Sequence, residues 1–257
     1  MSIQKNDKLN QLQILLPEEA IVSSRWLQDR GYSRQLLYRY VKSNWLKSVG
    51  GGNYSRQTTE ITWQGLIASL QQINKNSLHV GAETALNLQG FAHYLRLKGE
   101  KQIFVFTESP APSWVKSVPL DNSLQFIHKQ LFAKQEKTGL TKIPSPVKNW
   151  PLILSTPERA ILESLLFVKD AHSFTFAAEL MEGLTILRPR IVNALLKNCK
   201  HIGVKRLFMF LAEYHNHPWF NKIEKQSLEL GHGQRAIIAG GKLNKKYLIT
   251  VPEKFHD

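Results

Sequence analysis

Residues 34–42 carry a row of hydrogen-bonding side chains at helical spacing. The row consists of Arg34, Gln35, Tyr38, Arg39 and Lys42, and the opposite stripe consists of Leu36, Leu37, Tyr40 and Val41. Arginine pairs with guanine, glutamine with adenine and lysine with phosphate, so this polar face suits the major groove of DNA. Because residues near the start of a recognition helix usually reach the bases, we predict base contacts from Arg34, Gln35, Tyr38 and Arg39.

The segments around this row predict a winged helix-turn-helix. Ser23 or Ser24 can cap a short helix over residues 25–30, which Gly31 ends. Ser33 then caps the next helix, residues 34–44, and a helix over residues 7–16 precedes both. A glycine-rich turn within residues 45–56 predicts a β-hairpin wing, and we expect no further role for its three glycines.

The remainder of the chain alternates helical and strand patterns without a repeat. We predict a mixed α/β (α+β) fold in which a winged helix-turn-helix domain, residues 1–76, precedes a larger mixed α/β domain, residues 77–257. The predicted helices cover residues 62–74, 81–95, 173–183, 188–200 and 203–214, with another starting at Thr156-Pro-Glu158 and one turn at Trp114. The predicted strands cover residues 102–107, 124–128, 152–155, 234–239 and 246–251, with the last two flanking Gly240 and Gly241.

The positive charge of the chain is concentrated in two places. The 257 residues include 34 Lys and Arg against 20 Asp and Glu, a net charge of +14. Residues 25–56 and residues 188–206 each carry a net +6. The first window coincides with the predicted helix-turn-helix, which favours DNA as its partner. Basic residues also solvate helix faces, and a small helical module that binds protein is the alternative for the first window.

His215 and His217, with Glu213 and Cys199 nearby, are the residues best able to support metal or acid–base chemistry. Two histidines at i and i+2 do not share a helix face, so a polar turn is the favoured interpretation. No enzyme motif is found elsewhere in the sequence, and we expect no metal, no cofactor and no enzymatic activity. The alternative is a nucleic-acid-processing enzyme that uses His215 and His217.

Composition excludes several other classes of protein. A single cysteine rules out an intramolecular disulfide framework and a multi-cysteine metal site. No apolar run of about 18 residues is present, as a transmembrane helix would need, and residues 1–8 lack the apolar core of a secretory signal. We therefore expect a cytoplasmic protein that does not bind membranes.

Taken in order along the chain, several motifs resemble the AbiEi-type antitoxins of type IV toxin–antitoxin systems. They are Leu36-Leu-Tyr-Arg-Tyr-Val41, the Gly-Asn-Tyr of residues 52–54, the Gly-Ala-Glu-Thr-Ala-Leu of residues 81–86 with Gly90, Ser155-Thr-Pro-Glu-Arg-Ala160, Lys205-Arg-Leu-Phe-Met-Phe-Leu-Ala-Glu213 and the closing glycine-rich segment, residues 230–252. One departure is the wing sequence Gly50-Gly-Gly-Asn-Tyr54, where the family typically has Arg-Arg-Gly-Val-Tyr.

The resemblance implies a transcriptional repressor that is also an antitoxin. Its partners would be double-stranded DNA, at inverted repeats in its own promoter, and a nucleotidyltransferase toxin encoded alongside, with direct contact left open. The chain would be a monomer in solution or a dimer on DNA. Phosphate contacts would come from Ser24, Arg25, Ser33, Lys42, Lys47, Asn53 and Arg56. The alternative is a winged-helix transcriptional regulator whose α/β domain senses a ligand.

The second basic window has no role that the residues themselves define. The resemblance implies a second basic face that serves DNA or toxin neutralisation. This face would be formed by Arg188, Arg190, Lys197, Lys200, Lys205 and Arg206.

Overall fold

A computed structural model describes residues 3–73, 77–91, 102–133 and 136–256. The chain divides into two compact units. The first comprises Met1–His79, Glu100–His128 and Lys142–Ile153, and the second comprises Val80–Gly99, Lys129–Thr141 and Leu154–Asp257. Helices and several sheets are both present, so the mixed α/β (α+β) class predicted from the sequence is confirmed.

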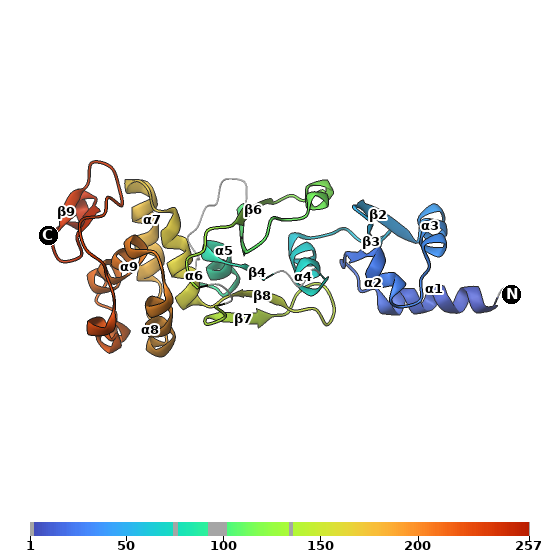
Figure 1. The fold of residues 1–257 in the computed structure, drawn as a ribbon, viewed down its shortest axis with the longest axis horizontal. Helices are drawn as coiled ribbons and strands as arrows, with labels where there is room; N and C mark the ends of the chain where they lie inside the picture. The colour runs from blue at the N-terminus through green and yellow to red at the C-terminus, as the bar shows by residue number, and fades with distance from the viewer. Residues whose placement is uncertain (1–2, 74–76, 92–101, 134–135, 257) are drawn as a thin grey trace. The chain divides into compact units, whose positions relative to one another are not determined.

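The first unit begins with helices and short strands (Figure 1). They surround a small core of buried apolar side chains. In order these are α1 (Ile3–Leu15), β1 (Val22–Ser23), α2 (Ser24–Gln28), α3 (Arg34–Lys42), β2 (Leu46–Gly50) and β3 (Asn53–Arg56). Ser23 caps α2 by accepting from Trp26 N, and Ser33 caps α3 by accepting from Leu36 N. The two helices and the hairpin expected here are therefore observed.

The hairpin forms a three-stranded antiparallel sheet of order β1-β3-β2. Val22 pairs with Tyr54, and Leu46 pairs with Arg56. The register between β2 and β3 shifts between Ser48 and Gly50, which is an irregularity of the β-bulge type. The pairing of β1 attaches the start of α2 to the hairpin.

The rest of the first unit contains α4 (Trp63–Ile73), β5 (Gln102–Thr107), the 3-10 helix η1 (Ser113–Ser117) and β6 (Ser123–Ile127). Strands β5 and β6 run parallel in a five-stranded sheet of order β6-β5-β4-β8-β7. Its other strands are β4 (Leu78–Val80), β7 (Leu140–Ile143) and β8 (Leu152–Ser155). Parallel neighbours need a crossover, and residues 108–122, which include η1, supply it between β5 and β6.

The second unit is mainly helical. It contains α5 (Ala82–Leu88), α6 (Pro157–Ser164), α7 (Ala171–Glu182), α8 (Pro189–Asn198) and α9 (Ile202–Tyr214), followed by the hairpin β9 (Lys242–Asn244) and β10 (Ile249–Val251). Helix α6 is central: it contacts α5, α7, α8 and α9, and all its residues after Pro157 are buried (Figure 1). The helix starts as expected, with Thr156 at the N-cap and Pro157 in the first turn.

Three expectations about the elements were wrong in detail. The helix predicted over residues 81–95 ends at Leu88, because Gly90 adopts a φ of +80° and the N–H of Phe91 bonds back to Leu86 O. Residues 92–95 of that prediction lie outside the described residues. Strands β4 and β7 were missed because each has only three or four residues, too few to show a clear period.

The C-terminal hairpin also differs from the prediction. Residues 234–239 are not a strand: Ile237 N and Ile238 N donate to the side chain of Thr250 rather than to a neighbouring backbone. The hairpin turn lies at residues 245–248 instead of at Gly240-Gly241, with Asn244 Oδ1 accepting from Tyr247 N. No helix in the described parts of the chain is long and apolar enough to cross a bilayer.

Candidate nucleic-acid interface

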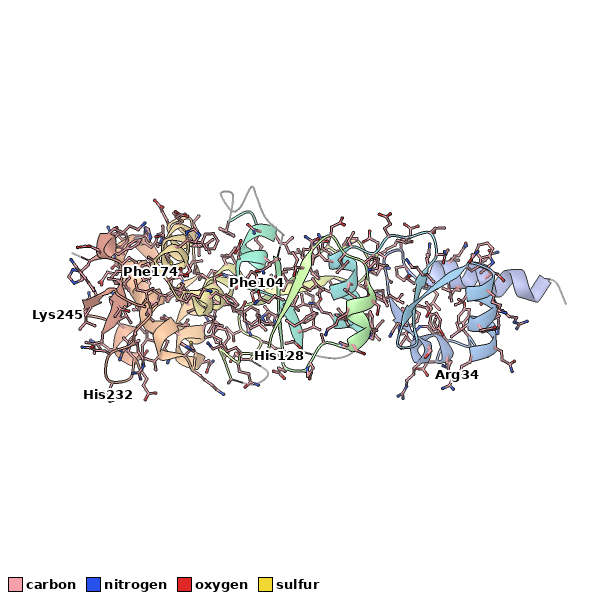
Figure 2. The ribbon with its side chains drawn as sticks, turned by 90° about the horizontal axis from the view of Figure 1, so that it is seen from above. Arg34, Phe104, His128, Phe174, His232 and Lys245 are labelled. Carbon is pink, nitrogen blue, oxygen red and sulfur yellow. The ribbon has the colours of Figure 1, made fainter. Side chains whose placement is uncertain are left out.

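Helix α3 presents two different faces. Leu36, Leu37 and Tyr40 are buried, and burial raises the pKa of the Tyr40 phenol. The opposite face is exposed, and its side chains together line one shallow open hollow. These side chains are Arg34, Gln35, Tyr38 and Arg39. The structure thus brings together all four residues predicted to contact bases, and Figure 2 shows Arg34 at the outer edge of this unit.

The exposed face carries a large aromatic side chain among its cations. Tyr38 is 60% exposed, and the ammonium group of Lys42 lies 5.0 Å from the centre of its ring. Lys42 follows Tyr38 by one helical turn and continues the row of cations toward the end of α3. A cation held over a phenol next to two arginines is suited to anionic and aromatic partners, and nucleic acid offers both.

The turn between α2 and α3 forms hydrogen bonds with α1. Gly31 ends the first helix with a φ of +84°, a conformation that costs glycine nothing. Tyr32 is buried and its hydroxyl donates to Lys8 O, while Lys8 Nζ donates to Gly31 O. Burial raises the pKa of Tyr32. These contacts fix the angle at which α3 leaves the turn.

Helix α2 has an exposed cation and an aromatic cluster. Arg25 is exposed at its start. The guanidinium of Arg30 lies 3.8 Å from the centre of the Trp26 ring, and Trp26 meets Trp150 edge to face at 6.2 Å. The loop that carries Trp150 therefore packs on α2 within the same unit.

Two of the residues expected to contact phosphate are engaged inside the fold. Asn53 is buried, and its amide donates to Gly50 O and Gly51 O at 3.1 Å each. The Arg56 guanidinium donates to Leu16 O at 2.7 Å and to Gln13 O, and it pairs with Glu18 at 3.4 Å. Both residues therefore shape the module, and neither remains among the phosphate contacts that we propose.

The glycine-rich turn does more than reverse the chain, contrary to expectation. Gly50, Gly51 and Gly52 all have positive φ, and the indole of Trp114 lies directly against Gly51. The last residue of η1 and the segment that follows it, residues 117–122, line an open groove of about 1170 Å³ together with β2 and residues 57–64. The sequence indicated a helical turn at Trp114, but no local pattern indicated that it would meet the wing.

The second basic window does not form one exposed face, so this expectation was wrong. Lys205 and Arg206 are 4% and 2% exposed, and Lys205 Nζ donates to Glu229 O. Lys197 pairs with Glu224 at 2.7 Å. Arg190 and Lys200 are exposed. Two of the six cations are therefore buried in the core and cannot contribute to an exposed basic face.

Arg188 is exposed but is bound to a buried carboxylate. Its guanidinium donates to Glu158 Oε1 and Oε2 at 2.9 Å each, and its own N–H donates to Oε1 at 3.0 Å. Burial opposes ionisation of Glu158, yet the hydrogen bonds from Arg188 hold the pKa of this carboxyl below its ordinary value. The pair joins α6 to the start of α8.

Arg206 lies in α9 and binds only carbonyl groups among the contacts described. Its guanidinium donates to the carbonyl oxygens of Leu230 (2.8 Å), Gly231 (2.9 Å), Gly233 (2.6 Å) and Leu248 (3.2 Å). Burial lowers the pKa of this guanidinium. Arg206 thus holds the loop around residues 230–233 and the turn before β10 onto the same helix.

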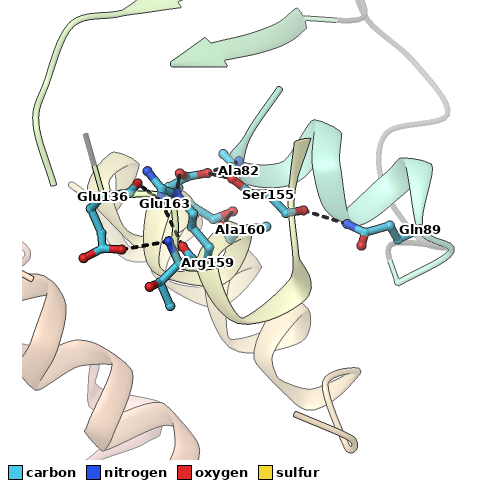
Figure 3. A network of polar contacts seen from close by, with 9 residues as sticks. Ala82, Gln89, Glu136, Ser155, Arg159, Ala160 and Glu163 are labelled. Atoms are coloured by element: carbon cyan, nitrogen blue, oxygen red, sulfur yellow. Dashed lines mark hydrogen bonds and ion pairs between the residues drawn. The ribbon is translucent and has the colours of Figure 1, made fainter. Parts of the chain in front are cut away.

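A buried polar network supports α6 within the second unit (Figure 3). Glu163 accepts from Arg159 Nε at 2.9 Å, from Ser155 Oγ at 2.7 Å and from Ala82 N at 3.1 Å. Arg159 also donates to the carbonyls of Glu136 and Thr138. Ser155 and Arg159 of the Ser155–Ala160 motif belong to this network, so the motif positions α6 against its neighbours.

Family models match both parts of the chain. A model described as a transcriptional regulator, AbiEi antitoxin, of type IV toxin–antitoxin systems matches residues 100–252. A second, described as the N-terminal domain of the AbiEi antitoxin transcriptional regulator, matches residues 5–97. The chain belongs to the AbiEi antitoxin family. The family resemblance inferred from the ordered motifs is therefore confirmed, and an AbiEi antitoxin is a transcriptional regulator of a toxin–antitoxin system.

A solved structure shares the fold of this chain. The crystal structure of the RV2827C protein from Mycobacterium tuberculosis superimposes with a TM-score of 0.55 and 12% sequence identity. The match covers 90% of this chain and 86% of that one. No curated protein matches the sequence.

The two histidines considered for catalysis, His215 and His217, lie in the second unit. His217 is buried, its Nε2 lies 2.7 Å from Met181 O, and its ring stacks on Trp219. Burial lowers the pKa of His215. Cys199 is buried, and burial raises the pKa of its thiol. Among the described residues, no three or more His, Cys, Asp or Glu side chains are grouped so that they could hold a metal ion.

Proposed function

We propose that this chain is a DNA-binding antitoxin that represses its own operon through an N-terminal winged helix-turn-helix domain, residues 1–76. The remaining domain, residues 77–257, counteracts a nucleotidyltransferase toxin encoded alongside. The observation that carries the proposal is the exposed face of α3, where Arg34, Gln35, Tyr38 and Arg39 stand together around one hollow. Membership of a family of transcriptional regulators supports it.

The chemistry of this face fits the major groove. Each arginine can donate two hydrogen bonds to guanine O6 and N7, and Gln35 can pair with the edge of adenine. Tyr38 offers an apolar ring to a thymine methyl group and a hydroxyl to phosphate or base. Since the helix is capped by Ser33 and packed through its leucines, these side chains are displayed on a rigid element.

The phosphate contacts surround this helix. The Ser33 hydroxyl accepts from Leu36 N, so its own proton remains available for a phosphate oxygen. Lys42 extends the row at the end of α3, and Lys47 is exposed on β2 of the wing. Ser24 and Arg25 lie at the start of α2. We propose these five as the groups that orient the domain on the duplex.

Inverted repeats place two copies of the module on one site, so the complex is a dimer on DNA, whereas the free chain is a monomer. The deciding experiment measures binding of the full-length protein to its own promoter against a scrambled duplex of the same length. Specific binding is expected to be tighter by about a thousandfold or more at physiological salt. Equal affinity for the two duplexes would contradict the repressor proposal.

Replacement of Lys42 by alanine is expected to weaken binding to promoter and scrambled DNA alike. Its ammonium meets a phosphate, so the slope of log K against log salt should become shallower by about 0.9. Titrations at several salt concentrations measure this slope. Lys246→Ala removes the same charge from a surface ion pair with Glu213 in the second unit and should leave the slope unchanged. A loss confined to the promoter would mean instead that Lys42 reads a base.

The antitoxin role is tested by co-expression with the neighbouring toxin gene. Excision of residues 77–257 would also take residues 100–128 and 142–153 out of the first unit. The sharper comparison therefore uses the full-length chain and a full-length variant with Arg34→Ala and Arg39→Ala. Both are expected to restore growth, because neutralisation does not depend on the α3 surface. Failure of the wild-type chain to restore growth would contradict the antitoxin role. Failure of the variant alone would show that neutralisation requires DNA binding by the α3 surface.

A further inference from the structure

The tip of the β2–β3 hairpin is made of three consecutive glycines in the left-handed region. Gly50, Gly51 and Gly52 have φ angles of +97°, +58° and +73°. Other residues rarely adopt such a φ angle, and the three glycines have no side chains of their own to brace the turn. Within the hairpin the Asn53 amide donates to Gly50 O and Gly51 O. Glycine-rich turns have high conformational entropy, so a tip of this kind needs outside contacts to hold one position.

Two contacts from outside the hairpin hold this tip, one from the start of α2 and one from η1. The N–H of Ser24, at the start of α2, donates to Gly52 O at 2.7 Å. On the other side, η1 packs against β2. A methyl group built on Gly51 would lie 3.2 Å from Cδ1 and 3.3 Å from Cβ of Trp114. One built on Gly50 would lie 3.7 Å from Trp114 Cβ and 3.8 Å from Ser117 Oγ. The absence of side chains is thus what allows the indole to lie on the backbone.

Next to this contact, β2 borders an open groove. From Lys47 to Gly50, β2 borders the open groove of about 1170 Å³ that separates it from residues 117–122. Trp114 is the residue of η1 nearest to Gly51, and it shares the contact with Gly50 with Ser117.

We propose that Trp114 is a positioning residue for DNA binding: its indole holds the glycine tip so that the wing and Lys47 meet the phosphate backbone. The inference rests on the proposed function, in which the wing contacts DNA. A wing that is already ordered loses less entropy on binding, and a loss of order is expected to lower affinity by about tenfold. Trp114 lies in the crossover between β5 and β6, so the α/β part of the unit contributes to DNA binding without touching DNA.

The test compares Trp114→Ala, Lys47→Ala and the double variant, all in the full-length chain, on the promoter duplex over a range of salt concentrations. Trp114→Ala is expected to weaken binding about tenfold and to make the salt slope shallower by about one, as loss of one phosphate contact does. In the Lys47→Ala background, Trp114→Ala should have less than about a twofold effect, because both act through one contact. Trp114→Phe, which keeps a ring against Gly51, should recover most of the affinity.

Cooperative thermal unfolding of each variant shows that it is folded, and Trp114→Leu replaces Trp114→Ala if the latter is not. An equal loss from Trp114→Ala in the wild-type and Lys47→Ala backgrounds would overturn the proposal, because Trp114 would then act on the fold in general. Unchanged affinity and slope would overturn it as well, while leaving the proposed function intact. Absence of promoter binding by the wild-type chain would refute the proposed function, and this inference with it.

Discussion

Substitution of Arg206 by methionine is expected to lower the free energy of unfolding by about 3–5 kcal/mol, because hydrogen bonds from a charged donor contribute about 1.5–3 kcal/mol each and several are lost together. The side chain is 2% exposed and donates to four backbone carbonyls, and among the described contacts only Leu248 O has another donor, the backbone N–H of Arg235. Methionine fills a similar volume, so the loss reports the unpaired carbonyls rather than a cavity. Urea unfolding of the full-length protein measures it.

Two further variants sharpen this expectation. Arg206→Lys keeps the charge but not the planar fork, so it can serve only some of the carbonyls and should fall between wild type and Arg206→Met. Arg235→Met is the matched control, because Arg235 is exposed in the neighbouring segment and its side chain donates only to Gln234 O among the described contacts. It should change stability by less than about 0.5 kcal/mol. Similar losses from Arg206→Met and Arg235→Met would show that the buried guanidinium does not organise the 230–248 region.

Arg34→Ala and Arg39→Ala are each expected to weaken binding to the promoter by about 1–3 kcal/mol and to relax base preference at one position. The reason is geometric: both side chains stand on the exposed face of α3, where a guanidinium can make two bonds to one guanine edge. Competition titrations against duplexes with single base-pair changes measure affinity and specificity together. Each variant should lose its preference at one base pair and keep its preferences at the other base pairs.

The control for these variants is Arg30→Ala, which removes one positive charge from the same module. Arg30 follows α2 and lies outside α3; its guanidinium stacks on Trp26 and donates to Trp26 O. It is expected to leave base preference unchanged. If Arg34→Ala and Arg39→Ala instead weaken binding to scrambled DNA as much as binding to the promoter, both arginines contact phosphate and other groups contact the bases.

Much of the interface could be predicted because its determinants are local. The apolar and polar stripes of α3 follow from the 3.6-residue period, and its start follows from a serine that can cap the helix. Gly31 ends α2 for an equally local reason. Such features depend on residues within one or two helical turns, so they can be predicted without knowledge of the tertiary structure. The ordered motifs identified the family for the same reason, since a motif is a local pattern.

Tertiary structure decided which polar residues are free to act. Arg56, Lys205 and Arg206 look like any other cations in the sequence, yet their partners lie 24 to 43 residues away along the chain. Likewise, Trp114 meets Gly51 only because the β5–β6 crossover folds back on the wing. The sequence by itself determined helix α3, its cap and the family. Which cations are exposed and what holds the wing depend on contacts between distant segments, which no local period or charge count encodes.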